Sequence, residues 1–273
     1  METLHIEPSY RVFLGNIRKF RLLVVGAGGT GSSLALHLAA LAYHTRQQGL
    51  ELDITLVDHD LVEYKNCGRQ ALSVQAARLG SVPKVADLAL RLNAAYGLDI
   101  SAWAMPFTSE VAAEWIYGQQ RSGVAHLLFG CVDNYLARRE LAMAVDNHRG
   151  KVWAIDCGNE YNNGQILIGN LGQGSKIKSD PLGLCSGLPS PYWQEPDLLQ
   201  PDPTPTETSC AVRILAGTQS LMVNRMAATL AAQYAAVFIL QQQVLHLGTV
   251  FTLNPPTANS RLITPTTLRP YRA

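Results

Sequence analysis

The stretch RLLVVGAGGTG, residues 21–31, decides the fold of this chain. A short run rich in Leu and Val ends at a glycine-rich turn, and the apolar run SSLALHLAALAYHTRQQ follows. A turn of this kind between a strand and a helix lets backbone amides approach a phosphate, and the helix N-terminus adds partial positive charge. We therefore predict a nucleotide or dinucleotide site built on Gly26, Gly28, Gly29 and Gly31. The alternative is that these glycines serve only to pack a helix against a strand.

Strand and helix patterns alternate on both sides of this turn. We expect strands at 54–57, 100–105, 126–131 and 152–157, and helices at 77–96, 111–120 and 135–148. This alternation predicts an α/β fold with a Rossmann-like, doubly wound and mainly parallel sheet. Such sheets bind ligands beyond the carboxyl ends of their strands, which is where the glycine turn, Asp58 and Asp133 fall.

The pattern changes after Gly158. Residues 161–168 favour an antiparallel strand, and residues 171–209, rich in proline and glycine, predict a long crossover loop. A helix is expected over 211–247, with a break near Gly217, followed by a Thr/Pro-rich tail. We expect one domain over 1–273, with an N-terminal extension (1–20), a nucleotide-binding core (21–158), the crossover loop (171–209) and C-terminal helices with a tail (210–273).

Composition excludes several classes of protein. With 22 Lys+Arg against 21 Asp+Glu the net charge is +1, which argues against a general nucleic-acid binder. The first residues contain no apolar signal region, so we expect a cytoplasmic protein. The longest apolar stretch, 226–240, is shorter than the roughly 20 residues that span a bilayer, so we expect a buried helix and no membrane. Charged residues make up 16% of the chain, which leaves apolar surface for a partner.

Three further motifs make the nucleotide site more specific. They are VDHDLVEYKNCGRQ (57–70), GSVPK (80–84) and CVDNYLARRE (131–140). With the glycine turn, and in this order, they resemble the ThiF/MoeB/HesA family, the bacterial relatives of ubiquitin-activating enzymes. The resemblance runs from residue 21 to about 139 and recurs weakly around Cys210. Within the family, the short chain and degenerate second half are most similar to ThiF-related proteins of the PRTRC gene cassette.

The resemblance implies an ATP-dependent reaction. ATP and Mg²⁺ would bind, and the C-terminal carboxylate of a small ubiquitin-like or sulfur-carrier protein would attack the α-phosphorus to give an acyl-adenylate. Asp58 would hold the ribose, and Asn66, Arg69 and Lys84 would grip the phosphates. Asp133 would ligate Mg²⁺. As alternatives, Asp133-Asn134 would only cap the next helix, and Arg138, which matches a family arginine, would pair with a carboxylate.

The chain also departs from the family pattern. Many relatives bind zinc through two Cys-x-x-Cys pairs; this chain has neither, so we expect no zinc. The turn GSVPK is one residue longer than the family's, and Arg11 is a candidate for the arginine that relatives donate to a neighbouring subunit in a homodimer. For a nucleophilic cysteine we favour Cys210 over Cys185, with the alternative that neither acts. Cys67, Cys131 and Cys157 are expected to be packing thiols.

Three classes of function remain open at this stage. The first is an adenylyltransferase, for which Arg69, Lys84, Asp133 and Cys210 would be catalytic. The second is an NAD(P)- or FAD-dependent oxidoreductase, which the glycine turn and Asp58 would serve equally well. The third is a catalytically weakened homologue that acts as a binding scaffold.

Overall fold

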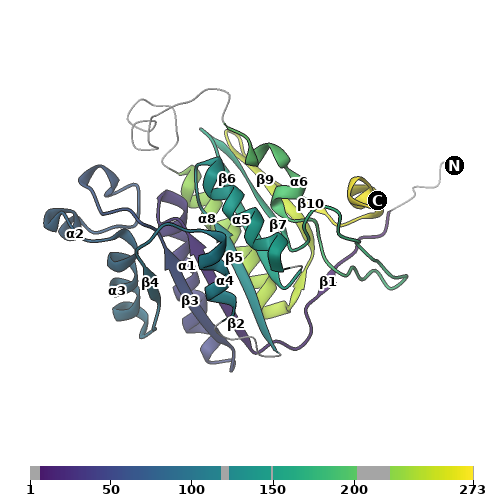
Figure 1. Ribbon diagram of the computed structural model, residues 1–273, viewed down its shortest axis with the longest axis horizontal. Coiled ribbons are helices and arrows are strands. Elements are labelled where there is room, and N and C mark those ends of the chain that lie inside the picture. Colours follow the sequence, from purple (N-terminus) through teal and green to yellow (C-terminus); the bar gives the residue numbers. More distant parts are fainter. Residues whose placement is uncertain (1–6, 118–122, 149, 202–221, 273) are drawn as a thin grey trace.

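The computed structural model describes residues 7–117, 123–148, 150–201 and 222–272. Its centre is an eight-stranded sheet in the order β10-β9-β7-β6-β5-β2-β3-β4 (Figure 1). The parallel part consists of β2 (Lys19–Val25), β3 (Glu51–Val57), β4 (Ser101–Trp103), β5 (Val124–Gly130) and β6 (Val152–Asn159). The antiparallel part adds β7 (Asn163–Gly169), β9 (His246–Leu253) and β10 (Pro256–Leu262). The predicted α/β fold with a doubly wound, mainly parallel sheet is confirmed.

Helices cover both faces of the sheet (Figure 1). One face carries α1 (Gly29–Arg46), α3 (Lys84–Tyr96) and α8 (Val223–Ala236), and the other carries α4 (Ser109–Tyr117), α5 (Tyr135–His148) and α6 (Pro191–Gln194). On β2, Leu22 and Val24 pack with the first set and Leu23 and Val25 with the second. A parallel strand buried on both faces reads as an unbroken apolar run, which explains the sequence LLVV.

The single helix expected over 77–96 is wrong. The structure has two helices there, α2 (Val74–Leu79) and α3, separated by the turn that contains the GSVPK motif. Gly80 ends α2 with a φ of +70°, in the left-handed region that favours glycine, and Pro83 precedes the first residue of α3. The motif therefore starts a new helix at Lys84.

The expectation that residues 210–273 form only helices and a tail is also wrong, because residues 243–262 form strands. The helix α8 continues as a π-helical turn, η3 (Val237–Gln241). The helix ends at Gln242, whose φ is +52°. The chain then forms β8 (Gln243–Val244), which pairs with β1 (Val12–Phe13), and the hairpin β9–β10 that completes the main sheet. Two short helices end the described chain, α9 (Pro265–Leu268) and η4 (Arg269–Tyr271).

The crossover segment contains two short helices before residue 202, α6 and η2 (Pro196–Leu199). The Ser190 hydroxyl caps α6 by accepting a hydrogen bond from the Trp193 amide. Leu188 and Tyr192 are fully or almost fully buried, so this part of the segment packs onto the sheet. The expected break near Gly217 lies outside the described residues.

Within the described residues, one helix is long and apolar enough to cross a membrane, the continuous stretch of α8 and η3 over Val223–Gln241. The buried core helix of a globular protein meets the same criterion. Here the side of α8 that contains Ala227, Ala228 and Ala231 is fully buried and packs against α1 and the sheet. The apolar side of α8, which could have packed against a second subunit, is therefore buried within its own chain. The homodimer stays a prediction.

Candidate functional site

A cleft of about 1050 Å³ opens at the carboxyl edge of the parallel strands. The loops after β2, β3, β5 and β6 line it, as expected for a doubly wound sheet. The structure places most of the predicted site residues on its wall, namely Gly26, Gly28, Gly29, Asp58, Asn66, Arg69, Lys84 and Asp133. These residues come from motifs that lie far apart in the sequence.

Close packing requires glycine in the loop after β2. Gly26 has a φ of +91°, and a Cβ there would lie 2.6 Å from the carbonyl oxygen of Cys131. A Cβ on Gly31 would lie 1.8 Å from the carbonyl oxygen of Gly26. Gly31 is thus a packing residue that lets the loop fold back on α1. Gly28 precedes α1, and no side chain caps the helix, so its N-terminus can meet an anion in the cleft.

Asp58, at the end of β3, fixes the shape of this loop. One of its carboxylate oxygens accepts a hydrogen bond from the Ala27 amide at 2.6 Å, and the other accepts one from the Asp60 amide at 2.7 Å. The carboxylate therefore joins the glycine loop to the loop after β3. Its predicted contact with a ribose stays a prediction.

Lys84, the first residue of α3, is buried and forms an ion pair with Asp60. Its Nζ lies 2.7 Å from Asp60 Oδ2, and its backbone amide donates to the Asp60 carbonyl at 2.9 Å. Burial acts to raise the pKa of Asp60, but the hydrogen bond and positive charge of Lys84 outweigh it and lower that pKa. The ion pair holds a cation at the wall of the cleft despite the extra residue in the GSVPK turn.

Arg69 and Asn66 lie together on the segment after β3. Asn66 ends the short helix η1 (Tyr64–Asn66), and its Oδ1 accepts weak hydrogen bonds from Arg69 and Gln70, both at 3.4 Å. Arg69 is only 9% exposed, and its Nε and Nη1 atoms are buried without a hydrogen-bond partner. Unpaired donors on a buried guanidinium cost free energy, which an anionic ligand would recover.

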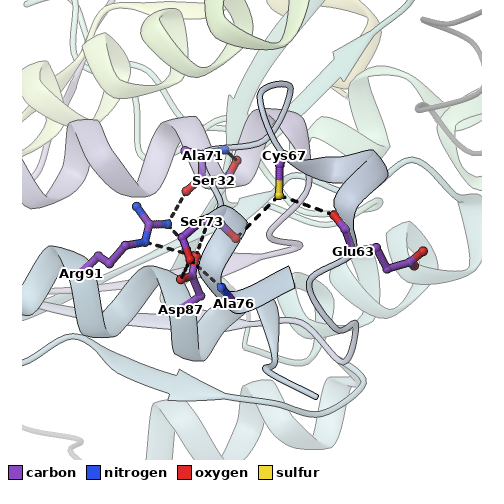
Figure 2. A network of polar contacts seen from close by, with 8 residues as sticks. All are labelled: Ser32, Glu63, Cys67, Ala71, Ser73, Ala76, Asp87 and Arg91. Atoms are coloured by element: carbon purple, nitrogen blue, oxygen red, sulfur yellow. Dashed lines mark hydrogen bonds and ion pairs between the residues drawn. The ribbon is translucent and has the colours of Figure 1, made fainter. Parts of the chain in front are cut away.

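A polar network holds residues 71–73, which follow Arg69 in the chain (Figure 2). The buried Asp87 on α3 accepts hydrogen bonds from the Ser73 amide and hydroxyl and from Arg91. Arg91 also donates to the Ala71 carbonyl, and the Ala71 amide donates to the Ser32 hydroxyl on α1. The network therefore anchors the end of the Arg69 segment to both helices.

The third acidic position lies after β5. Asp133 lines the cleft, and its neighbour Asn134 caps α5 by accepting a hydrogen bond from the Ala137 amide at 2.8 Å. Asn134 therefore has the helix-capping role that was the alternative interpretation of Asp133-Asn134. The carboxylates of Asp58 and Asp60, with His59, also lie close enough together to hold a metal ion. These oxygen donors suit Mg²⁺, and the assignment of Asp133 as its ligand stays a prediction.

Arg138, on the first turn of α5, pairs with a buried carboxylate. Its Nε lies 3.5 Å from Asp156 Oδ2, and the same oxygen accepts a hydrogen bond from the Tyr192 hydroxyl at 3.3 Å. Burial raises the pKa of Asp156, although Arg138 acts to lower it. From sequence, Arg138 was only a secondary candidate and Asp156 was not singled out.

Two of the remaining candidates, Cys185 and Arg11, do not line the cleft. Cys185 is 6% exposed, its burial raises the pKa of its thiol, and it does not line the cleft. Arg11 is exposed, and its backbone pairs with Leu184 in the crossover segment. Cys210 lies outside the described residues. Of the four cysteines that the structure describes, Cys131 and Cys157 line the cleft, and their mutual hydrogen bond together with burial raises the pKa of Cys157.

Sequence reasoning missed one cluster of the cleft, formed by Thr30, Asn159 and Asn224. The Asn159 amide donates to the Thr30 hydroxyl at 3.0 Å, and that hydroxyl donates to Asn224 Oδ1, also at 3.0 Å. The sequence holds little signal for Asn224, because the charged Arg225 stands beside it in the first turn of α8. Asn159 had the same signal as Asp58, a polar residue at the carboxyl end of a parallel strand.

Comparisons with known proteins agree with this fold. A crystal structure of E. coli MccB with AMPCPP and selenomethionine MccA superposes with a TM-score of 0.55 at 14% identity, covering 89% of this chain and 64% of that one. A structure of E. coli MccB with ATP gives 0.54 at 15% identity, covering 89% and 63%. The chain thus spans less than two thirds of the length of these proteins, and at this identity the likeness shows the fold. No curated protein sequence gives a significant match.

The family model of the ThiF family matches residues 10–270, nearly the whole chain. The match includes the glycine loop and every motif whose residues meet in the cleft. It also includes the antiparallel hairpin that the sequence pattern did not reveal. The chain belongs to the ThiF family.

Proposed function

We propose that this protein adenylates the C-terminal carboxylate of a peptide or small protein at the expense of ATP. The observation that carries the proposal is the buried guanidinium of Arg69, whose Nε and Nη1 atoms have no hydrogen-bond partner and which lines the same cleft as Lys84 and the uncapped N-terminus of α1. Three groups that favour an anion in one cleft suit a triphosphate. The two MccB structures, one with ATP and one with AMPCPP plus MccA, support this substrate class.

The reaction needs alignment and charge stabilisation more than covalent help from the protein. A carboxylate oxygen of the partner attacks the α-phosphorus, the bond to the bridging oxygen of the β-phosphate breaks, and pyrophosphate leaves. Arg69 and Lys84 would stabilise the charge that develops on the leaving pyrophosphate. Asp58 would hold the ribose. Mg²⁺, when bound by Asp133 with phosphate oxygens, would supply further charge neutralisation.

The finer parts of the proposal concern the partner and the fate of the product. We propose a small ubiquitin-like or sulfur-carrier protein as the partner, in line with the sequence resemblance. The same resemblance supports a homodimer in which Arg11 reaches the neighbouring cleft, transfer of the acyl group to Cys210, and a kinship with the PRTRC-cassette proteins. The low charged fraction of the chain, 16%, is consistent with a partner surface.

The test is ATP–pyrophosphate exchange in the presence of Mg²⁺ and candidate partner proteins or their C-terminal peptides. Exchange requires both a bound carboxylate and reversible adenylation. We expect Lys84→Met to lower the exchange rate at least about 100-fold, because one lost charge-assisted contact in a transition state costs about 3 kcal/mol. Lys19→Met is the matched control, because Lys19 starts β2 at the opposite edge of the sheet and pairs with Glu51.

Two outcomes would contradict the proposal. Tight binding of NAD(P) or FAD with no binding of ATP would favour the oxidoreductase, although that reading gives Arg69 and Lys84 no task. Binding of ATP without exchange for any partner would favour a binding scaffold. Loss of exchange in Lys19→Met as large as in Lys84→Met would show that the effect is not specific to the cleft.

A further inference from the structure

One wall of the cleft has no assigned task in the proposed reaction. It is formed by Asn224, on the first turn of α8, which reaches the glycine loop from a part of the chain far away in sequence. Asn224 is 4% exposed, and its Nδ2 atom is buried without a hydrogen-bond partner. A buried amide with two unused protons costs free energy unless a ligand accepts from it.

A chain of hydrogen bonds fixes which end of the amide faces the ligand. Asn159 Nδ2 donates to Thr30 Oγ1, so this hydroxyl uses its single proton to donate to Asn224 Oδ1. The oxygen of Asn224 is therefore occupied, and its NH₂ group is left pointing away from Thr30. Thr30 and Asn224 are buried and Asn159 is partly exposed, so water competes little for the bond between Thr30 and Asn224.

The free NH₂ group lies against the start of α1. A Cβ on Gly29 would lie 2.6 Å from Asn224 Nδ2, so the amide packs directly on this glycine, the first residue of the helix. The N-terminus of α1 has no side-chain cap and attracts an anion by its backbone amides. A side-chain donor at this place adds a hydrogen bond to the same anion.

We propose that Asn224 is a phosphate-binding residue of the cleft, held in a donating orientation by Thr30 and Asn159. The inference rests on the proposed function in that it takes ATP as the ligand. It extends the site to α8, which none of the recognised motifs includes. Gly29 has a second task in this arrangement, because any larger residue would push the Asn224 amide out of its place.

The test compares binding of ATP with binding of adenosine by titration calorimetry on the full chain in Mg²⁺. Asn224→Asp keeps the shape and an oxygen that accepts from Thr30, but it turns a carboxylate oxygen toward the phosphates. We expect its affinity for ATP to fall at least about 30-fold and its affinity for adenosine to stay within about twofold. Thr30→Val, which removes the orienting hydroxyl, should weaken ATP binding about fivefold, and Thr30→Ser should restore it.

Each outcome decides between the inference and its alternatives. If Asn224→Asp binds ATP as tightly as the wild type, or loses adenosine as strongly as ATP, Asn224 has a structural role and the inference is wrong. If Asn224→Asp does not fold, Asn224→Ala with the same pair of ligands decides in the same way. If the wild type itself does not bind ATP, the proposed function fails and the inference fails with it.

Discussion

The parallel and antiparallel parts of the sheet have different roles in this molecule. In the parallel part, the loops that follow β2, β3, β5 and β6 carry the residues of the cleft. In the antiparallel part, no residue of β7, β9 or β10, all of which the structure describes, lines the cleft. The difference shows that the hairpin completes the hydrophobic core, whereas polar recognition is concentrated at one edge of the parallel strands.

Two glycines give the strongest test of this division, because their packing is equally tight. A Cβ on Gly31 would lie 1.8 Å from the Gly26 carbonyl oxygen, and a Cβ on Gly169, at the end of β7, would lie 1.8 Å from the Pro189 carbonyl oxygen. We expect Gly31→Ala and Gly169→Ala each to lower the free energy of unfolding by about 4 kcal/mol. Only Gly31→Ala should also weaken ATP binding in the protein that remains folded.

The control for this pair is Gly28→Ala, since a Cβ on Gly28 would have nothing within 4 Å. Its unfolding free energy, from urea titrations, should stay within about 0.5 kcal/mol of the wild type. An equal loss of ATP affinity in Gly31→Ala and Gly169→Ala would show that the two parts of the sheet are not separable.

The polar network of Asp87, Ser73 and Arg91 provides a prediction with a smaller expected effect. Asp87→Ala removes the carboxylate that holds Ser73 and Arg91, and it leaves a buried hydroxyl and a cation without their partner. We expect a loss of about 3 kcal/mol in unfolding free energy and about tenfold weaker ATP binding, because the Arg69 segment loses its anchor. The measurements are urea unfolding and calorimetric titration with ATP.

Asp53→Ala is the matched control in the same part of the sheet. Asp53 pairs with Arg21 at 3.2 Å near the amino ends of β2 and β3, away from the cleft. It should cost about 1 kcal/mol and leave ATP binding unchanged. If Asp87→Ala binds ATP like Asp53→Ala, the network stabilises the fold without positioning Arg69.

The smallest expected effect is a dependence of stability on pH. His126, on β5, packs edge-on against Trp115, and burial together with the charges of Arg21 and His148 lowers its pKa to about 4. The unfolded chain binds this proton near pH 6.5, so the contribution to stability is present above pH 6.5 and is lost as pH falls to about 4. The loss should be about 2 kcal/mol, after allowance for partial screening by solvent.

Thermal unfolding of His126→Gln between pH 4 and 7 checks this expectation. The variant should show a smaller decline than the wild type, because His37 and His246, whose pKa values burial also lowers, still contribute. His44→Gln, at an exposed site near the end of α1, should decline as the wild type does. A decline of equal size in His126→Gln and the wild type would assign the effect to other groups, such as the acidic network around Asp87.

The parts of the molecule that could be predicted from sequence are those with local signals. The glycine turn and the apolar run before it identify β2 and α1, and the spacing of apolar residues gives α5 its bounds, Tyr135–His148. The edge strand β10 could not be found in this way, because almost all of its side chains are exposed and its sequence PTANSRL has no apolar pattern. β9 joins the sheet by pairing with β7, which is distant in sequence, so the local pattern does not indicate this pairing.

The site shows the same limit. Asp58, Asn66, Arg69 and Lys84 could be predicted because their motifs have recognisable spacing. Asn224 and Asp156 could not, because each acts on a residue from another element, Thr30 and Arg138, and nothing local marks the pairing. Asp156 contacts Arg138 only because the fold places α5 beside β6.

The pairing of β7 with β9 has a consequence for synthesis of the protein. β7 leaves the ribosome well before β9, and until β9 arrives, one side of β7 offers unpaired amides and carbonyls, including those of Gly164 and Ile166. At about 5 to 20 residues per second, the delay is on the order of ten seconds. During that interval a chaperone, or the corresponding strand of another nascent chain, competes for the place that β9 will take.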